Sequence, residues 1–272
     1  MSDVTHHRPP KVSGVPEDSR ASRRIKPRAG GPSERLAPKL RRLPSIAVSW
    51  IVAQPAMLLL ATFMIGLGFF VTKILLENDA IARADARFPE WLEGQRTSFW
   101  TDASYVGSLI GDAPILVPLV AGVALALALQ SRWRTASFVI QAGMVEFTCY
   151  GLSVLFITRL RPDVVRLDPF NVHHSFPSGH VAASTAVYGA MALLLAAHFK
   201  ALPLRIAIWS IAASIPVIVA LSRIYRGEHH PLDVVAGFLM GLGAILVALF
   251  AVRTARAVAE LRAERRSNET FA

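Results

Sequence analysis

Six apolar segments, each about long enough to cross a lipid bilayer, constrain the fold of this chain more than any other feature. A helix needs about 20 predominantly apolar residues to span the hydrocarbon core. Segments that approach this length occupy residues 46–76, 104–130, 136–158, 181–199, 206–222 and 232–252. Hydrophobic residues make up 53% of the chain and charged residues only 18%, a balance that a soluble domain rarely shows. The sequence therefore predicts an all-α fold, a bundle of six transmembrane helices.

Basic, polar segments flank this predicted membrane domain, which covers residues 44–252. Residues 1–43 are rich in Pro, Ser, Gly and Arg without apolar periodicity, which predicts a disordered tail. Residues 253–272 form a second basic tail, and the two tails hold most of the surplus behind the net charge of +10. Neither tail interleaves aromatic with basic residues or carries a DNA-binding motif. We therefore expect contacts with anionic lipid headgroups and no binding of nucleic acid.

The positions of Arg and Lys predict the orientation of the bundle. Both tails and the links at 131–135 and 200–205 are basic, whereas the loop at 77–103 mixes both signs of charge. Basic loops stay in the cytoplasm, so both termini are predicted to be cytoplasmic. The loops at 77–103, 159–180 and 223–231 would then face outward. Aromatic residues in the first of these loops predict a segment that lies along the headgroups and could cap a site.

Chemistry-bearing residues gather at the segment ends on this predicted outer side: Arg161, His180, Arg223, His229 and Asp233. Arg161 and Arg223 can each bind a phosphate with bidentate, charge-assisted hydrogen bonds. Ser178 and Gly179 precede a predicted helix, where backbone N–H groups and the helix dipole favour an anion. Together these residues predict a phosphate-binding site.

The two histidines have complementary predicted roles. His229 and Asp233 are four residues apart, so they are neighbours if a helix begins near His229. The carboxylate could hold one ring nitrogen protonated and leave the other free to attack phosphorus. His180 is then the natural proton donor to the departing oxygen.

These motifs resemble the type-2 phosphatidic-acid phosphatase superfamily. Its signature is Lys-x6-Arg-Pro, then Pro-Ser-Gly-His, then Ser-Arg-x5-His-x3-Asp. Here the second part reads Pro177-Ser-Gly-His180, and the third part runs from Ser222-Arg to Asp233. The resemblance implies membrane lipid phosphatase activity that needs neither a metal nor another cofactor.

The resemblance also implies a role for each site residue. His229 would be the nucleophile that forms a phosphohistidine, Asp233 its orienter and His180 the general acid. The implied phosphate ligands are Arg161, Arg223, Ser178 and Gly179.

The first motif departs from the family pattern. Val154 stands where the family has lysine, seven residues before Arg161. Arg159 fits a variant of the motif that carries an additional arginine, and we count it among the predicted phosphate ligands. Arg166 or His173 could supply the missing charge instead.

Two acidic residues lie inside predicted membrane segments, where they should face the bundle interior. Asp112 could pair with Arg159 or hold a substrate group. For Glu146 we favour an interhelical hydrogen bond or a protonated acid. Gly237 and Gly241, spaced as Gly-x-x-x-Gly, predict close helix packing.

The preferred hypothesis is a metal-independent phosphomonoesterase or pyrophosphatase for a membrane lipid at the outer, periplasmic face of a bacterial inner membrane. Candidate substrates are phosphatidic acid, phosphatidylglycerol phosphate, undecaprenyl diphosphate and the phosphates of lipid A. One alternative is a phosphotransferase of the same architecture that uses an acceptor lipid. Another is a catalytically impaired lipid-binding homologue in which Val154 marks a lost activity. The sequence assigns no oligomeric state.

Overall fold

The computed structural model describes residues 26–168 and 174–270, which form nine α-helices and one short 3-10 helix. Six helical units in this part of the chain are long and apolar enough to cross a membrane. They span Ser45–Glu77, Ser98–Leu129, Trp133–Phe156, Gly179–Ala196, Leu202–Tyr225 and Pro231–Thr270. The predicted all-α bundle with six membrane spans is confirmed.

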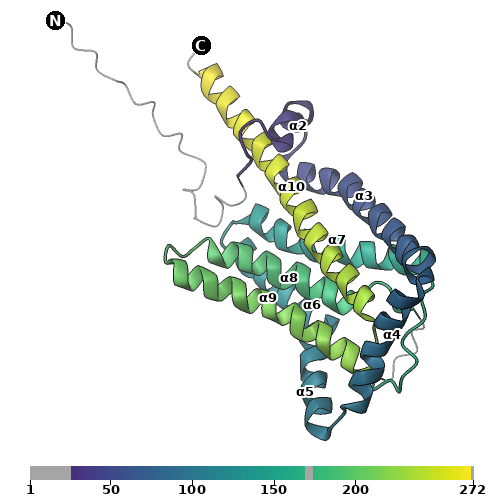
Figure 1. Cartoon of the computed structure of the whole chain (residues 1–272). Coiled ribbons are helices and arrows are strands. Elements are labelled where there is room, and N and C mark those ends of the chain that lie inside the picture. The colour runs from purple at the N-terminus through teal and green to yellow at the C-terminus, as the bar shows by residue number, and fades with distance from the viewer. Residues whose placement is uncertain (1–25, 169–173, 271–272) are drawn as a thin grey trace, which may run out of the picture.

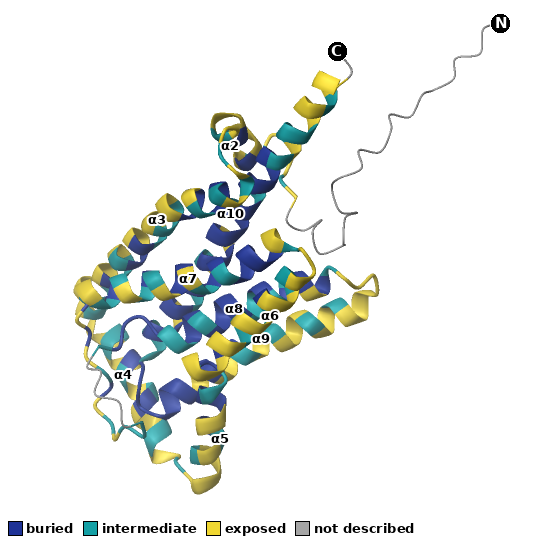
Figure 2. Cartoon of the chain, turned by 180° about the vertical axis from the view of Figure 1, so that it is seen from behind, coloured by how far each residue is buried: buried dark blue, intermediate teal, exposed yellow. Residues whose placement is uncertain are grey.

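Helix α10 (Pro231–Thr270) is the centre of the bundle. It packs against α3 (Ser45–Lys73), α7 (Trp133–Phe156) and α8 (Gly179–Ala196), while α9 (Leu202–Tyr225) covers α8 from the other side (Figure 1). Buried residues are concentrated along α10 and α8, and exposed ones along the outer faces of α3 and α9 (Figure 2). The exposed apolar side chains form the surface expected to face lipid.

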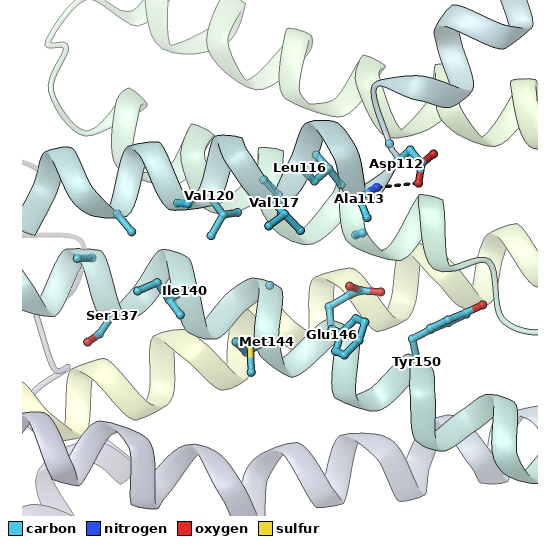
Figure 3. A pocket seen from close by; sticks show the side chains of 18 of the residues that line it. Asp112, Ala113, Leu116, Val117, Val120, Ser137, Ile140, Met144, Glu146 and Tyr150 are labelled. Atoms are coloured by element: carbon cyan, nitrogen blue, oxygen red, sulfur yellow. Dashed lines mark hydrogen bonds between the residues drawn. The ribbon is translucent and has the colours of Figure 1, made fainter.

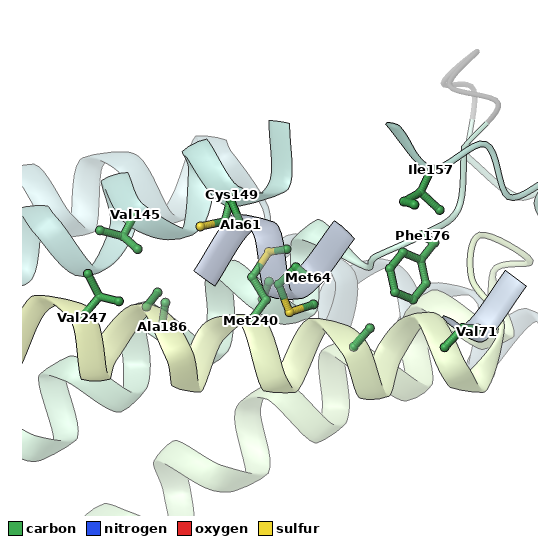
Figure 4. Close-up of a cluster of buried hydrophobic side chains, with 13 residues drawn as sticks. Ala61, Met64, Val71, Val145, Cys149, Ile157, Phe176, Ala186, Met240 and Val247 are labelled. Atoms are coloured by element: carbon green, nitrogen blue, oxygen red, sulfur yellow. The ribbon is translucent and has the colours of Figure 1, made fainter. Parts of the chain in front are cut away.

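The main core lies where α3, α7, α8 and α10 meet. Met64, Cys149 and Met240 are fully buried there, and Phe176 extends the cluster into the segment before α8 (Figure 4). Small residues let α8 and α10 approach closely: a Cβ added at Gly237 would lie 2.6 Å from the carbonyl oxygen of Ser178. A Cβ at Gly241 would lie 2.5 Å from the carbonyl oxygen of Ala182. The close packing predicted from the glycine pair is confirmed.

The second apolar segment is two helices, whereas the sequence predicted one continuous helix over 104–130. Helix α5 (Ser98–Leu109) packs on α9, and α6 (Ala113–Leu129) packs on α7. Between them Asp112 caps α6, because its side chain accepts a hydrogen bond of 2.7 Å from the backbone N–H of Ala113. At Gly111 an added Cβ would lie 2.7 Å from Val219, so the break sits tightly against α9. The chain thus changes direction beside the start of α8.

The first tail differs from its prediction where it is described, and the second tail, predicted only to be basic, is helical. Residues 1–25 lie outside the described part, but Pro32–Leu40 form helix α2 inside the segment predicted to be disordered. Ala37 of α2 packs in a cluster with α10, and Arg262 donates a hydrogen bond of 2.7 Å to the carbonyl of Arg41. Helix α10 continues to Thr270, so the second tail is mostly a helical extension.

The loop after α3 is helical. It contains η1 (Leu75–Glu77) and α4 (Asp79–Gly94), and it leads into α5. Phe88 and Leu92 of α4 pack on the core beneath α9, while Trp91 is exposed. Arg96 then fixes the end of α4 to α9, because its guanidinium donates hydrogen bonds of 3.3 and 2.9 Å to the carbonyl of Tyr225. This loop therefore covers the end of the bundle where the motif residues lie.

Candidate active site

The nucleophile candidate, His229, lies in the short turn between α9 and α10. Gly227 in this turn has φ of +77°, in the left-handed region that favours glycine, and an added Cβ would lie 2.7 Å from Val164. Hydrogen bonds from the backbone N–H of Arg226 to Ser222 and of Glu228 to Arg223 close the turn. His229 is thereby held at the ends of both helices.

The ring of His229 is buried and its tautomer follows from its neighbours. Nδ1 lies 2.7 Å from the carbonyl oxygen of Ser175, which can only accept a hydrogen bond, so Nδ1 carries the proton. In the neutral ring Nε2 then keeps its lone pair. Burial, reinforced by the positive charge of Arg223, lowers the pKa of His229 well below its usual value of 6.5. The ring is therefore neutral at physiological pH and can attack through Nε2.

Asp233 differs from its predicted role as the direct partner of His229. Its Oδ2 lies 3.9 Å from Nδ1 of His229, beyond hydrogen-bond distance, and the carbonyl of Ser175 takes the position that the sequence assigned to this carboxylate. The fully buried carboxylate instead accepts a hydrogen bond of 2.8 Å from the backbone N–H of His230. Its own carbonyl accepts one of 3.0 Å from Ser178. Asp233 thus connects the second motif to the third through the hydrogen bond from Ser178. Its negative charge favours a positive charge on the ring of His229.

Arg159 also differs from its predicted role as a phosphate ligand. One of its guanidinium nitrogens pairs with Asp233 and another with Asp85 of α4, and all three side chains are buried. Asp85 further accepts a hydrogen bond of 2.9 Å from the backbone N–H of Leu232 in the first turn of α10. The sequence analysis missed Asp85, because the sequence of loop 77–103 gave no sign that α4 would pack against the start of α10. The row Asp85–Arg159–Asp233 connects α4 to the start of α10.

The predicted phosphate arginines, Arg161 and Arg223, do lie together. Both surround the fully buried carboxylate of Glu228: Arg161 pairs with it directly, and Nη2 of Arg223 lies 3.7 Å away. Arg166 donates to the same carboxylate at 2.9 Å. Burial lowers the pKa of the Arg161 guanidinium, although Glu228 opposes this shift. Glu228 therefore balances a cluster of cations next to the nucleophile.

A second carboxylate, Asp168, pairs with the other side of this cluster. Nη1 of Arg223 lies 2.6 Å from Oδ2 of Asp168, and Nε of Arg226 lies 2.8 Å from Oδ1. Burial alone would raise the pKa of Asp168, but the hydrogen bond from Arg226 and the charges of both arginines outweigh it and lower the pKa. The sequence analysis missed Glu228 and Asp168. The signal was the number of arginines near the motifs, since buried guanidinium groups need anions.

The start of α8 supplies a set of hydrogen-bond donors. Ser178 is fully buried, and its hydroxyl has no hydrogen-bond partner among the described residues. Within the same part of the chain, the backbone N–H groups of Gly179 and His180 have no acceptor. Gly179 is required by packing, because an added Cβ would lie 2.9 Å from the ring of Tyr150. These groups are the donors that the Pro-Ser-Gly-His motif predicts to bind an anion.

His180 lies in the first turn of α8 and is partly exposed. Its Nε2 is 3.6 Å from Oδ1 of Asp112, the residue at the break between α5 and α6. The predicted pairing of Asp112 with Arg159 is therefore wrong, since Arg159 is engaged by Asp85 and Asp233. Across residues 26–168 and 174–270, no group of three or more His, Cys, Asp or Glu side chains is placed to hold a metal ion.

The part of the chain that carries these residues matches a known protein family. Residues 135–257, which contain all three motifs, match the family model of the PAP2 superfamily. This part of the chain is therefore similar to the PAP2 superfamily. The lysine expected at the start of the PAP2 signature falls at Val154, inside the matched region. Arg166 brings an additional guanidinium to the cluster, whereas His173 lies outside the described residues.

Two curated proteins are similar to part of this chain. Phosphatidylglycerophosphatase B of Bacillus subtilis (strain 168) is 40% identical over 90 residues, which is 32% of this chain and 42% of that protein. Undecaprenyl-diphosphatase of Sulfolobus acidocaldarius is 33% identical over 105 residues, 39% of this chain and 47% of that protein. The chain thus spans less than half the length of these relatives.

A solved structure extends the likeness beyond the motifs. The fold is similar to the crystal structure of a transmembrane PAP2-type phosphatidylglycerolphosphate phosphatase from Bacillus subtilis. The matched region covers 75% of this chain and 94% of the chain in that crystal structure. The TM-score is 0.58 and the sequence identity 22%. The likeness shows that the two proteins share a fold.

Proposed function

We propose that this protein is a metal-independent lipid phosphate phosphatase that works through a phosphohistidine. The observation that carries the proposal is the tautomer of His229, whose Nδ1 donates to the carbonyl of Ser175 at 2.7 Å. The neutral ring directs its lone pair from Nε2, within the field of Arg223 and Arg161. A phosphate bound at the start of α8 would meet this nitrogen and the two arginines together.

In the first step, Nε2 of His229 attacks phosphorus and forms a P–N bond while the P–O bond to the lipid breaks. The leaving oxygen takes a proton from His180, which lies beside Asp112 and would carry that proton once the phosphate anion is bound. The imidazolium part of the phosphohistidine is stabilised by Asp233, 3.9 Å from Nδ1. The arginines and the N–H groups of Gly179 and His180 neutralise the equatorial oxygens.

In the second step, water attacks the phosphohistidine and the P–N bond breaks. Neutral His180 accepts the proton of this water, which returns both histidines to their starting states. Inorganic phosphate then leaves. A transferase of the same architecture would use a lipid hydroxyl in place of water in this step, with the same atoms exchanged.

The proposed substrate is a phosphorylated lipid in a bacterial inner membrane. Names of the curated relatives include a phosphatidylglycerophosphatase and an undecaprenyl-diphosphatase, which supports a lipid phosphate ester or diphosphate. The basic residues of α2 and the distal part of α10 lie at the end of the bundle away from the site (Figure 1). The positive-inside rule then supports a site on the outer face, with the basic ends near anionic cytoplasmic headgroups.

Phosphate release from a panel of lipid phosphates and diphosphates tests the proposal with detergent-purified protein, with and without EDTA. We expect EDTA-resistant release that His229→Ala lowers roughly 1,000-fold or more, since it removes the covalent step. His180→Ala should lower release about 100-fold or more for alkyl esters. With an aryl phosphate, whose leaving oxygen needs no proton, the His180→Ala loss should shrink while the His229→Ala loss stays.

Three results would contradict this scheme. Full activity of His229→Ala would exclude the phosphohistidine, and loss of activity in EDTA would indicate a metal. Phosphate that appears on an added acceptor lipid instead of in solution would identify the transferase. No release by correctly folded wild-type protein would indicate the impaired homologue. Val154→Lys would then be the first variant to test for a gain of activity.

A further inference from the structure

An apolar cavity of about 880 Å³ lies between α6, α7 and α8 (Figure 3). At one end it is lined by Gly179 and His180 of the proposed phosphate site and by Asp112. Its walls are built from apolar side chains of α6 and α7, among them Leu116, Val117, Val120, Ile140 and Met144. Its volume is in the range of pockets that bury most of a small ligand.

The cavity is continuous with the phosphate site, and this continuity identifies its occupant. A phosphate at the start of α8 has its ester oxygen near His180, so the esterified group must leave the site along a path that His180 lines. The apolar walls between membrane-spanning helices suit a lipid chain and exclude a polar alcohol. The occupant is the lipid part of the substrate, an assignment that rests on the proposed function.

One acidic side chain, Glu146, lies in this wall, which also contains the smaller polar residue Ser137. Glu146 of α7 is 5% exposed and lines the cavity, and it has no hydrogen bond or ion pair among the described residues. Its carboxyl group extends from α7 toward α6 (Figure 3). The interhelical hydrogen bond predicted for Glu146 is therefore not formed with any described residue.

A carboxyl group without a partner in apolar surroundings is unfavourable even when it is protonated. A bound group that accepts or exchanges a hydrogen bond removes this cost, whereas a plain hydrocarbon chain does not. Tyr150 packs against Gly179, and Glu146 lies one helical turn, about 6 Å, further along α7. Glu146 therefore meets the lipid only a few bonds beyond the phosphate.

We propose that Glu146 is a specificity residue close to the phosphate, where its protonated carboxyl group donates a hydrogen bond to an ester carbonyl of the lipid or accepts one from a lipid hydroxyl. A glycerolipid phosphate has ester carbonyls at this place. A polyprenyl phosphate has only hydrocarbon there and leaves the carboxyl group without a partner. Glu146 thus favours glycerolipid-type substrates over polyprenyl phosphates.

The ratio of kcat/KM for didecanoyl phosphatidic acid to that for farnesyl phosphate tests this role. Glu146→Leu should lower kcat/KM about tenfold for phosphatidic acid, the effect of one lost hydrogen bond in an apolar site, and should not lower it for farnesyl phosphate. Glu146→Gln keeps hydrogen-bonding atoms and should retain most of the preference. Met144→Leu, on the same wall, is the matched control and should leave the ratio unchanged.

Equal losses of kcat/KM on both lipids, or an unchanged ratio in Glu146→Leu, would overturn the proposal. Lipid binding measured by native mass spectrometry in the His229→Ala background separates this outcome from failure of the proposed function. His229→Ala should prefer phosphatidic acid to farnesyl phosphate, and His229→Ala/Glu146→Leu should not. If the wild type releases no phosphate but this binding preference follows Glu146, the phosphatase proposal fails and the specificity role stands. If binding shows no dependence on Glu146, the specificity role is wrong whatever the activity.

Discussion

At the scale of single residues, the site is a set of buried charges whose pairing decides their roles. Arg159 and Arg161 are two positions apart, yet Arg159 is held by Asp85 and Asp233 while Arg161 lies with Arg223 around Glu228. A guanidinium between two buried carboxylates is already neutralised, so Arg159 acts on the reaction through Asp233. We regard it as a positioning residue.

Replacement of Arg159 by Met tests this distinction. It leaves two buried carboxylates without their cation, so the free energy of unfolding should fall by about 3–5 kcal/mol. We expect a lower kcat but an unchanged affinity for inorganic vanadate, a phosphate mimic, because Arg159 does not reach the anion site. Thermal unfolding and vanadate inhibition measure the two effects.

Two further variants serve as controls for Arg159. Arg161→Met should weaken vanadate inhibition clearly, since this arginine lies in the proposed phosphate cluster. Adding Asp85→Asn to Arg159→Met removes one uncompensated charge and should restore part of the lost stability. If Arg159→Met weakens vanadate inhibition as much as Arg161→Met does, Arg159 is a phosphate ligand after all.

Sequence analysis could predict which residues gather at the site but not how they pair. The motif spacing led to His229, His180, Arg161 and Arg223 because helix ends on one side of a bundle must lie together. The partners Asp85 and Asp168 come from loops whose contacts depend on how α4 and the segment before α8 fold over the bundle. Local sequence carries no record of such long-range ion pairs.

At the scale of helices, the contact between α8 and α10 sets the position of the anion site. The carbonyl of Ser178 and the backbone of Ala182 face α10 at Gly237, where an added Cβ would lie 2.6 Å from that carbonyl. Backbone atoms cannot give way as a flexible side chain can. The glycine thus allows the start of α8 to lie against the first turns of α10.

Gly237→Ala should therefore separate the two helices and displace Ser178 and Gly179. We expect phosphate release to fall at least about tenfold and the thermal midpoint to fall with it, as overpacking of a core contact commonly costs 1–3 kcal/mol. Gly66→Ala in α3 is the control, since an added Cβ there meets no atom within 4 Å. That variant should keep its activity; if Gly237→Ala is equally harmless, the contact does not position the site.

The break between α5 and α6 is the clearest difference between sequence and structure at this scale. Hydropathy is high on both sides of Gly111 and Asp112, so an apolar count predicts one helix. Asp112 as an N-cap with Pro114 in the first turn of α6 is a helix-start signal that the sequence does contain. The break brings Asp112 to His180, a contact that a straight helix would not make.

At the scale of the whole molecule, charge is divided between the two ends of the bundle. The site end carries buried arginines matched by carboxylates, whereas α2 and the distal part of α10 carry basic residues on an exposed surface. This asymmetry underlies the proposed orientation, with the site facing outward.

Single-cysteine labelling in intact bacterial cells tests the orientation. The chain has one cysteine, the buried Cys149, so Cys149→Ala provides a cysteine-free background. A membrane-impermeant maleimide should label Arg83→Cys on α4 in intact cells and Glu264→Cys on α10 only after permeabilisation. The reverse pattern would place the site in the cytoplasm, and retained phosphate release would confirm that each variant is folded.

The sequence by itself determined the class of fold and the candidate site residues of this protein. Apolar length fixes the number of membrane spans because each helix must satisfy its backbone hydrogen bonds within the bilayer. Motif spacing fixes which histidines and arginines lie at one end. Only the tertiary structure decided that the carbonyl of Ser175 orients His229, that Arg159 pairs with Asp233, and that Glu146 lines the same cavity as His180. Those outcomes depend on which buried polar groups pair with each other, and the paired groups come from segments that are far apart in the chain.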